Sequence, residues 1–362
     1  MKGKVLTGIK IFSLAAILLL GIVSIIASGG GSSSTAPATK NYTGVATQAQ
    51  IDEANAVALA VGAWLGGAPG ISIDIFGAVQ AGPEARQRSF SLGLMPLVLD
   101  DVIYSIGIPD FGVQLNAGIV TQDPFTIPGS CNEGPDFVIA GGATIASGAT
   151  INEITGAFSF SISFDDYCEV ESGGSLILNG KVKMSGKLDP ATLENELPDF
   201  LNYTITFSSI NLEYFESGDS ITLTGESSTK KGTFSADWEA VPMKVTMSYV
   251  IKDNSSDPVV AYWFRDVEIE LEEGDGFTDL TSMTGKYYDP LFGFVVMSIN
   301  EAIHMPDSGY WPASGSLILT GDAGTKALLT FIDVESYQVD ADTDGDGEYD
   351  DYSSGQQFWA DL

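Results

Sequence analysis

The stretch Phe158-Ser159-Phe160-Ser161-Ile162-Ser163-Phe164 alternates strictly between apolar residues and serine. Successive side chains of a β-strand point to opposite faces, so a period of two places the apolar side chains on one face and the serines on the other. A strand with one apolar and one polar face is typical of antiparallel sheets, which can bury one side and leave the other in water. The stretch therefore predicts a long antiparallel strand.

Related patterns recur along the chain. Residues 174–180, 218–225 and 315–321 each carry a short apolar run and end in glycine. We interpret them as strands that end in glycine turns, and their recurrence indicates either a weak repeat or chance in a β-rich chain. Long helices and strands do not alternate after residue 66, which argues against a parallel doubly wound sheet. The expected fold is mainly β: an antiparallel β-sandwich, or a strongly curved sheet or open barrel, with one N-terminal helix.

That helix is expected at residues 51–65, where apolar residues recur at helical spacing. Thr47 and Gln50 have the spacing of a capping box before it, and Gly66, Gly67 and Pro69 are expected to end it. Both faces of the helix are apolar. It therefore packs into the core or, alternatively, lines a cavity for a lipid-like ligand.

The composition restricts the partners. The chain has 362 residues, 44% of them hydrophobic, and a formal net charge of −32 from 16 basic and 48 acidic residues. A sizeable core is therefore feasible, with residues 41–362 forming one β-rich region or two subdomains, 41–170 and 171–362. Nucleic acids and anionic lipids are bound by clustered basic residues, which the sequence lacks, so neither partner is expected.

The first 27 residues have the order of an export leader. Lys2, Lys4 and Lys10 precede an apolar run at residues 11–27, which small residues follow. The run is slightly short for a membrane-spanning helix of about 20 residues, and both a cleaved export signal and an N-terminal membrane anchor fit it. Position 29 is Gly and not the Cys of a lipoprotein leader, so lipidation is not expected. Residues 28–40, rich in Gly and Ser, are expected to form a flexible linker.

The chain has two cysteines, Cys131 and Cys168. In an oxidising compartment such a pair most simply forms one disulfide, worth roughly 4 kcal/mol on the chain-entropy model. Two free buried thiols are the alternative. His304 is the single histidine, so a zinc site of the ordinary Cys/His kind is not expected.

One cluster has a definable chemistry, and that chemistry is cation binding. It is the acidic stretch Asp340-Ala341-Asp342-Thr343-Asp344-Gly345-Asp346-Gly347-Glu348-Tyr349-Asp350-Asp351. Ca²⁺ takes about six to eight oxygen ligands, and closely spaced aspartates with a glycine for the sharp bend can supply them. Two registers of a calcium loop fit: the first runs from Asp340 at position 1 to Asp351 at position 12, and the second begins at Asp342.

We favour the second register because Tyr349 then falls at the apolar position and can anchor the loop in the core. Position 12 becomes Ser353, so the bidentate carboxylate of an EF-hand is missing, and the expected flanks are strands. The loop resembles the Asp-x-Asp-x-Asp-Gly-x-x-Asp calcium loops of extracellular bacterial repeats. The alternative is an acidic hairpin tip whose Asp-Gly pairs make the turn. The predicted ion is Ca²⁺, bound weakly, and its predicted ligands are Asp342, Asp344, Asp346, Glu348 and Asp350.

The sequence argues against an enzyme. His304 has no Gly-x-Ser-x-Gly motif to act with, and a phosphate-binding loop is also missing from the sequence. Carboxylates are so numerous that pairs such as Asp165 and Asp166 carry little weight as glycosidase residues.

Three features of the chain form a recognisable whole. They are the leader with its Gly/Ser linker, the stretch from Tyr42-Thr43-Gly44 to Asn55-Ala56, and a closing strand followed by the acidic loop and Trp359. In these features the chain resembles uncharacterised exported β-rich proteins of Gram-negative bacteria. The resemblance implies a location in the periplasm, at the cell surface or outside the cell, and no activity.

Two functions are therefore expected. The first is a non-enzymatic cell-envelope or cell-surface protein with a binding or structural role, stabilised by the disulfide and by calcium. The second is a periplasmic carrier that holds an apolar or lipid-like small molecule under the helix at residues 51–65. A polysaccharide hydrolase ranks third.

Overall fold

The computed structural model describes most of the chain after residue 40. The described ranges are 41–74, 119–122, 125–128, 142–145, 149–152, 154–171, 174–192, 200–214, 220–231, 240–274, 276–306 and 311–361. The predicted leader (residues 1–27), the predicted linker (residues 28–40) and Cys131 lie outside these ranges, and the predictions about them therefore concern residues that the structure does not describe.

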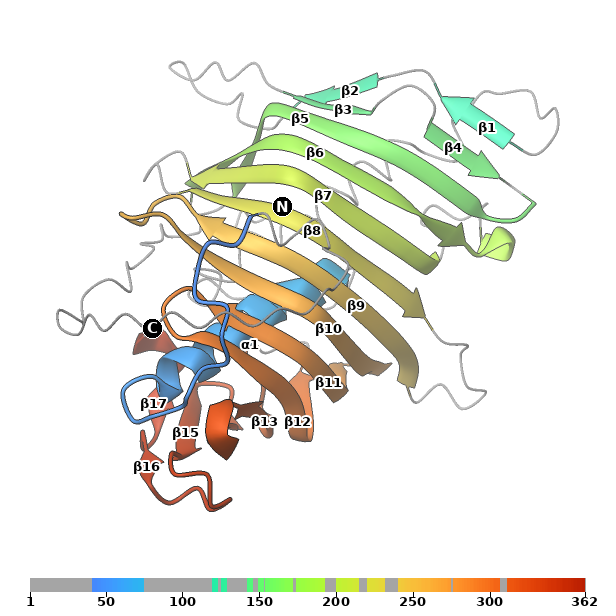
Figure 1. Cartoon of the computed structure of the whole chain (residues 1–362). Coiled ribbons are helices and arrows are strands. Elements are labelled where there is room, and N and C mark those ends of the chain that lie inside the picture. The colour runs from blue at the N-terminus through green and yellow to red at the C-terminus, as the bar shows by residue number, and fades with distance from the viewer. Residues whose placement is uncertain are drawn as a thin grey trace, which may run out of the picture.

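One antiparallel sheet dominates the described part (Figure 1). From β5 to β15 each strand pairs with the next along the chain, and β3 and β4 pair with the outer edge of β5. The strands are β1 (Ile119–Gln122), β2 (Phe125–Pro128), β3 (Gly142–Ile145), β4 (Ala149–Asn152), β5 (Ala157–Glu171), β6 (Gly174–Leu188), β7 (Phe200–Tyr214), β8 (Ser220–Lys231), β9 (Ala240–Asp253), β10 (Val260–Gly274), β11 (Phe277–Asp289), β12 (Gly293–Pro306), β13 (Ser314–Thr320), β14 (Lys326–Asp333), β15 (Ser336–Asp342), β16 (Tyr352–Ser353) and β17 (Gln357–Phe358).

The prediction of a mainly β, antiparallel fold with one N-terminal helix is confirmed. Of the architectures considered, the structure has the strongly curved sheet, which is open because its two outer ends do not pair. The boundary between the two possible subdomains, at residues 170 and 171, falls at the end of β5, and β5 pairs with β6 from Ala157 to Glu171 within this one sheet.

The alternation of residues 158–164 places its apolar side chains on the buried face of β5. Phe158, Phe160, Ile162 and Phe164 are at most 8% exposed, and the serines between them are partly exposed. The same alternation continues across β6 and β7, so one face of the sheet forms the main core and the opposite face of β5–β7 is polar. Farther along the opposite face, Trp263 and Tyr288 are buried in a second, smaller apolar cluster.

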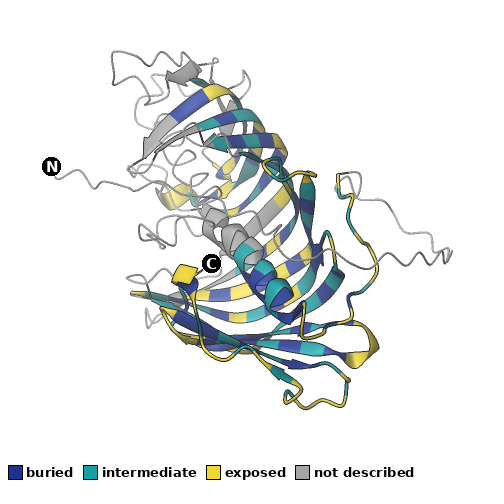
Figure 2. Ribbon diagram, turned by 90° about the vertical axis from the view of Figure 1, so that its left-hand side faces the viewer, coloured by how far each residue is buried: buried dark blue, intermediate teal, exposed yellow. Residues whose placement is uncertain are grey.

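Helix α1 (Ala56–Asp74) lies inside the curve of the sheet, against the face that forms the core (Figure 2). It begins five residues later than the expected start at residue 51, because Asp52 caps it: the Asp52 carboxylate accepts hydrogen bonds from the N–H groups of Ala54 (2.9 Å) and Asn55 (3.0 Å). The expected capping box is wrong. The segment that contains Thr47 lies beside β12 instead: the carbonyl oxygen of Thr47 accepts a hydrogen bond from Phe294 N–H (2.9 Å), next to the parallel bridge between Gln48 and Phe294.

The expected end of the helix is also wrong. The backbone stays helical through Gly66, Gly67 and Pro69 as far as Asp74. Local propensity is a weak guide when a helix is buried on several sides, and Leu59, Ala60 and Ala63 are 0% exposed. Of the helices in the described ranges, none combines the length and the apolar character that a membrane-spanning segment needs.

A line of backbone irregularities crosses the middle of the sheet. Ladder bonds are interrupted in β5, β7 and β10, where Asp166, Ser209 and Asp266 have φ of +46°, +60° and +51°. Bulges of this kind bend a strand and increase its twist. The long strands β5–β8 are accordingly curved along their length (Figure 1).

Glycines occupy this same line on the strands between the bulges. Gly180 (φ +122°) lies opposite Phe164, and Gly225 (φ +149°) lies opposite Phe207. Residues 174–180 and 218–225 therefore do not end in turns as expected, because β6 and β8 continue past both glycines. Gly321, in contrast, does follow the last residue of β13.

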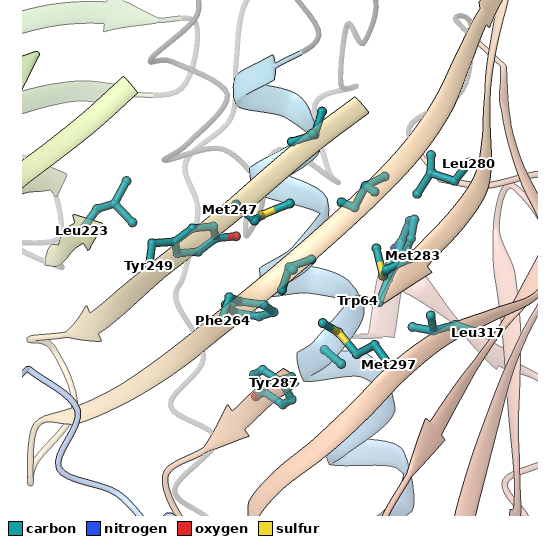
Figure 3. Packing of buried hydrophobic residues seen from close by; sticks show 14 of the residues in the cluster. Trp64, Leu223, Met247, Tyr249, Phe264, Leu280, Met283, Tyr287, Met297 and Leu317 are labelled. Atoms are coloured by element: carbon teal, nitrogen blue, oxygen red, sulfur yellow. The ribbon is translucent and has the colours of Figure 1, made fainter. Parts of the chain in front are cut away.

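The main core extends from Ala49 and α1 across the sheet to Trp359 near the C-terminus. Side chains of β8–β13 gather where α1 crosses the sheet (Figure 3), and Trp64 of α1 packs edge-on against Phe331 of β14 at 4.7 Å between ring centroids. At the C-terminus, Trp359 stacks on Tyr337 (4.1 Å) and Trp311 (4.3 Å). One aromatic group thus holds α1, β14, β15 and the C-terminal residues together.

Candidate metal centre

The acidic stretch forms a loop between two paired strands. β15 ends at Asp342, and β16 returns beside it, with Tyr352 opposite Ala341 and Ser353 opposite Asp340. The loop therefore has strands and not helices on both sides, as the sequence predicts. Its sharp bends occur at Gly345 and Gly347, whose φ values of +82° and +98° other residues rarely adopt.

Asp342 is the centre of this loop. It is 0% exposed, and its two carboxylate oxygens accept hydrogen bonds from the N–H groups of Gly345 (2.6 Å) and Gly347 (2.9 Å). Burying a carboxylate costs free energy unless polar groups replace the lost water. The loop is folded around this side chain because its main-chain N–H groups supply that replacement.

Asp351 closes the loop from its other end. One of its oxygens accepts hydrogen bonds from Thr343 N–H (2.8 Å), Thr343 Oγ1 (3.0 Å) and Asp344 N–H (3.1 Å). These donors favour the ionised form, so the pKa of Asp351 is lowered, chiefly by the Thr343 N–H. The carboxylate at the end of the loop is thereby held near the one at its start.

Three carboxylates converge as a result. Asp342, Asp344 and Asp351 each present an oxygen within 4.8 Å of the other two, an arrangement that can hold a metal ion. Two oxygens bound to one Ca²⁺ at about 2.3–2.6 Å lie at most about 5 Å apart, so the spacing suits a single cation. We call Asp342, Asp344 and Asp351 the aspartate triad.

The triad overlaps the expected ligand set only in part. It contains Asp342 and Asp344. Asp346 is exposed, and its carboxylate accepts a hydrogen bond from Glu348 N–H (2.8 Å). Glu348 and Asp350 are also exposed and lie outside the triad.

Asp351 was missing from the expected ligand set, although the sequence held a signal for it. It is position 12 in the register that begins at Asp340, the position of the bidentate ligand in an EF-hand. Tyr349, which led us to favour the other register, is half-buried, and burial followed by the nearby Asp342 raises its pKa.

The loop rests on the β13–β14 turn. A Cβ placed on Gly345 would lie 2.6 Å from the carbonyl oxygen of Ala323, so the two backbones are in close contact. The same turn holds the segment before α1: Asp322 N–H donates to Ala49 O (2.6 Å), and Ile51 N–H donates to Thr325 Oγ1 (3.0 Å). Contacts thus run from the aspartate triad through one turn to the start of the helix.

Two other residues singled out in the sequence lie far from the loop in the sheet. His304 of β12 is part-buried, and its Nδ1 lies 2.6 Å from an Asp279 carboxylate oxygen on β11. Cys168 of β5 is 1% exposed. Its expected partner Cys131 lies outside the described residues, so the pairing of the two stays a prediction.

Comparison with known proteins does not identify the chain: no family model, no curated protein and no solved structure matches it.

Proposed function

We propose that the chain is a non-enzymatic, exported cell-envelope or cell-surface protein with a binding or structural role, and that Ca²⁺ in the aspartate triad stabilises it. The triad is the observation that carries this proposal. The export leader in the sequence and the resemblance to exported β-rich proteins of Gram-negative bacteria support the location.

Calcium is the ion that best suits these ligands. The triad offers carboxylate oxygens alone, which favour a hard cation, whereas zinc prefers nitrogen and sulfur ligands in a tetrahedron. Mg²⁺ demands near-ideal octahedral geometry and gives up its water reluctantly. Ca²⁺ tolerates irregular geometry, and water and main-chain oxygens would complete its coordination.

The proposed effect of the ion is to fasten the C-terminal end of the fold. A cation between Asp342 and Asp351 draws the two ends of the loop together and offsets the repulsion among their carboxylates. Because the loop rests on the β13–β14 turn, the stabilisation extends to the segment that precedes α1. Extracellular calcium sites commonly have a Kd of about 10⁻⁴–10⁻³ M, so about 10 mM Ca²⁺ is expected to add about 1.4–2.7 kcal/mol.

Thermal unfolding tests the calcium proposal. The unfolding midpoint of the mature protein in EDTA is expected to rise by several degrees when Ca²⁺ is added in excess, and by less with Mg²⁺. Asp351→Asn should abolish most of this difference, because it removes a charged ligand. Asp346→Asn is the matched control, since Asp346 lies in the same loop but outside the triad, and it should keep the full difference.

The readout is the calcium-dependent difference and not stability itself, because Asp351→Asn also weakens hydrogen bonds in the calcium-free loop. A midpoint that neither EDTA nor millimolar Ca²⁺ changes would remove calcium from the proposal. Equal losses in Asp351→Asn and Asp346→Asn would show that the ligand set is wrong.

The export proposal has its own test. In a Gram-negative host the protein should be found in the periplasm or at the surface, with Cys131 and Cys168 joined and therefore unreactive to alkylation until reduced. Recovery from the cytosol with two alkylated thiols contradicts both the location and the disulfide.

A further inference from the structure

The outward face of β5, β6 and β7 is uniform in its chemistry. We call the outward positions 157–163 of β5, 181–187 of β6 and 202–208 of β7 the lysine face; the three strands are adjacent (Figure 1). Lys181, Lys183 and Lys187 of β6 are all exposed on it. Their cross-strand neighbours are hydroxyl or amide residues and one alanine: Ala157, Ser161, Ser163, Asn202, Thr206 and Ser208.

The charge on this face is opposite to that of the molecule. Acidic residues outnumber basic ones by 48 to 16 in the chain, yet none of the outward positions of the lysine face is acidic. The ammonium groups of its three lysines form no ion pair or hydrogen bond with the described residues. The sequence conceals this feature, because strand alternation and not a run of lysines brings the charges together.

Elsewhere on the outward surface, one lysine is paired with acidic residues of the neighbouring strand. Lys244 of β9 forms ion pairs with Glu268 and Glu270 of β10, the latter at 3.7 Å. The positive charge of Lys244 is thus neutralised within the fold. On the lysine face the residues paired with the three lysines on β5 and β7 are not acidic, and Glu226 lies one strand further on, opposite Thr206 of β7. The positive charges are therefore available to a partner.

The chemistry of the face selects the class of partner. Protein interfaces usually centre on aromatic or aliphatic anchors, and the outward positions of the lysine face hold no apolar side chain larger than alanine. Alternate residues of a strand lie roughly 7 Å apart, so the lysines form an extended row and not a compact pocket. A row of flexible point charges among hydroxyl and amide groups suits an extended, hydrated polyanion.

We propose that the lysine face binds an acidic polysaccharide, with lysines on its carboxylates and the Ser, Thr and Asn side chains on its hydroxyl groups. The inference rests on the proposed binding role in the cell envelope but not on the metal centre. The net charge of −32 does not prevent binding at physiological ionic strength, because charges beyond about 8 Å are largely screened.

Affinity electrophoresis of the mature protein tests this proposal. Native gels contain either polygalacturonate, in which every sugar carries a carboxylate, or neutral dextran, and EDTA is present throughout. Polygalacturonate should retard the wild-type protein and dextran should not. The triple variant Lys181→Gln, Lys183→Gln, Lys187→Gln should bind at least about tenfold more weakly, as expected when three exposed ion pairs are lost together.

The matched control changes the same charge elsewhere: Lys244→Gln, Lys252→Gln, Lys326→Gln should be retarded like the wild type. Equal losses in the two triple variants, or undiminished retardation of the first, would overturn the proposal. The proposal would also be overturned if the protein bound duplex DNA or anionic lipid vesicles but was not retarded by polygalacturonate. Retardation that appears only in a parallel gel with Ca²⁺ in place of EDTA would assign the polymer to the acidic loop and would also overturn the proposal. Because EDTA is present, a negative result leaves the calcium experiment unaffected.

Discussion

The middle of the sheet and its C-terminal end are held together in different ways. In the middle, strands of 12 to 15 residues pair along nearly their whole length, and a line of bulges and glycines bends them together. At the C-terminal end, β13, β14 and β15 have only 7 or 8 residues. There the stability comes from particular contacts between loops, above all those of Thr325, Asp342 and Trp359.

This difference shows how little a local pattern says about its role. Residues 218–225 and 315–321 look alike, with Thr222-Leu223-Thr224-Gly225 in one and Ile318-Leu319-Thr320-Gly321 in the other. Gly225 lies inside a strand and allows a neighbouring strand to approach, whereas Gly321 ends a strand and begins a turn. The strand that pairs alongside decides between the two roles.

The largest expected effect belongs to Gly225→Ala in the middle of the sheet. The new Cβ would lie 2.3 Å from Ser248 O and 2.4 Å from Tyr249 Cα, at a φ of +149°. Strain and overpacking each fall near the upper end of their usual range here, because three atoms lie within 2.5 Å of the new Cβ. Together they should lower the free energy of unfolding by about 4–6 kcal/mol, measured by urea denaturation. Gly355→Ala is the control, because Gly355 also has a positive φ (+62°) but no atom within 4 Å of its added Cβ. Equal losses in the two variants would show that crowding between strands is not the cause.

The next effect is expected at the C-terminal end. Trp359→Ala removes a ring that is 5% exposed and stacks on Tyr337 and Trp311. The free energy of unfolding should fall by about 3–5 kcal/mol. Phe358→Ala, next to it but 46% exposed, should cost less than about 1 kcal/mol. If the two variants unfold alike, the C-terminal residues do not take part in the cooperative core, and the contrast between the two regions is weaker than described.

The smallest effect is a pH dependence in the β14–β15 turn. The pKa of Asp333 is lowered, first by the Glu335 N–H (2.9 Å) and then by the Ser336 hydroxyl (2.8 Å), both of which donate to its carboxylate. A folded-state pKa below the unfolded value stabilises the protein above the unfolded pKa, and the stabilisation is lost as the pH falls through the folded one. Asp333→Asn should therefore reduce stability at neutral pH and approach the wild type in acid. Glu335→Gln, with the same charge change in the same turn, should show a pH dependence like that of the wild type.

Much of the fold could be predicted because burial imposes a period on the sequence. The alternation at residues 158–164 was sufficient to assign a strand with one buried face. The helix was predicted in the right part of the chain, but its start was placed five residues too early and its end nine residues too early. Asp52 and not Thr47 caps the helix, and its backbone continues past Gly66, Gly67 and Pro69, which shows that the local preference of these residues to end a helix did not decide its length.

The candidate site was predictable in kind and not in detail. Closely spaced aspartates and glycines indicated a cation loop, and Asp342 and Asp344 do belong to the triad. Asp351 joins them because the pairing of β15 with β16 returns the chain to the start of the loop. Spacing alone did not show which of the two registers the chain would follow.

Residue order by itself determined the features that depend on neighbours along the chain: the alternating faces of the strands and the acidic loop. The tertiary structure alone decided the features that depend on neighbours across strands. These are the placement of Gly225 inside a strand, the convergence of Asp351 on Asp342, and the row of lysines on a face without acidic residues. The physical reason is that hydrogen-bonded ladders bring together residues that are far apart in the chain, and local periodicity contains no information about which strands will pair.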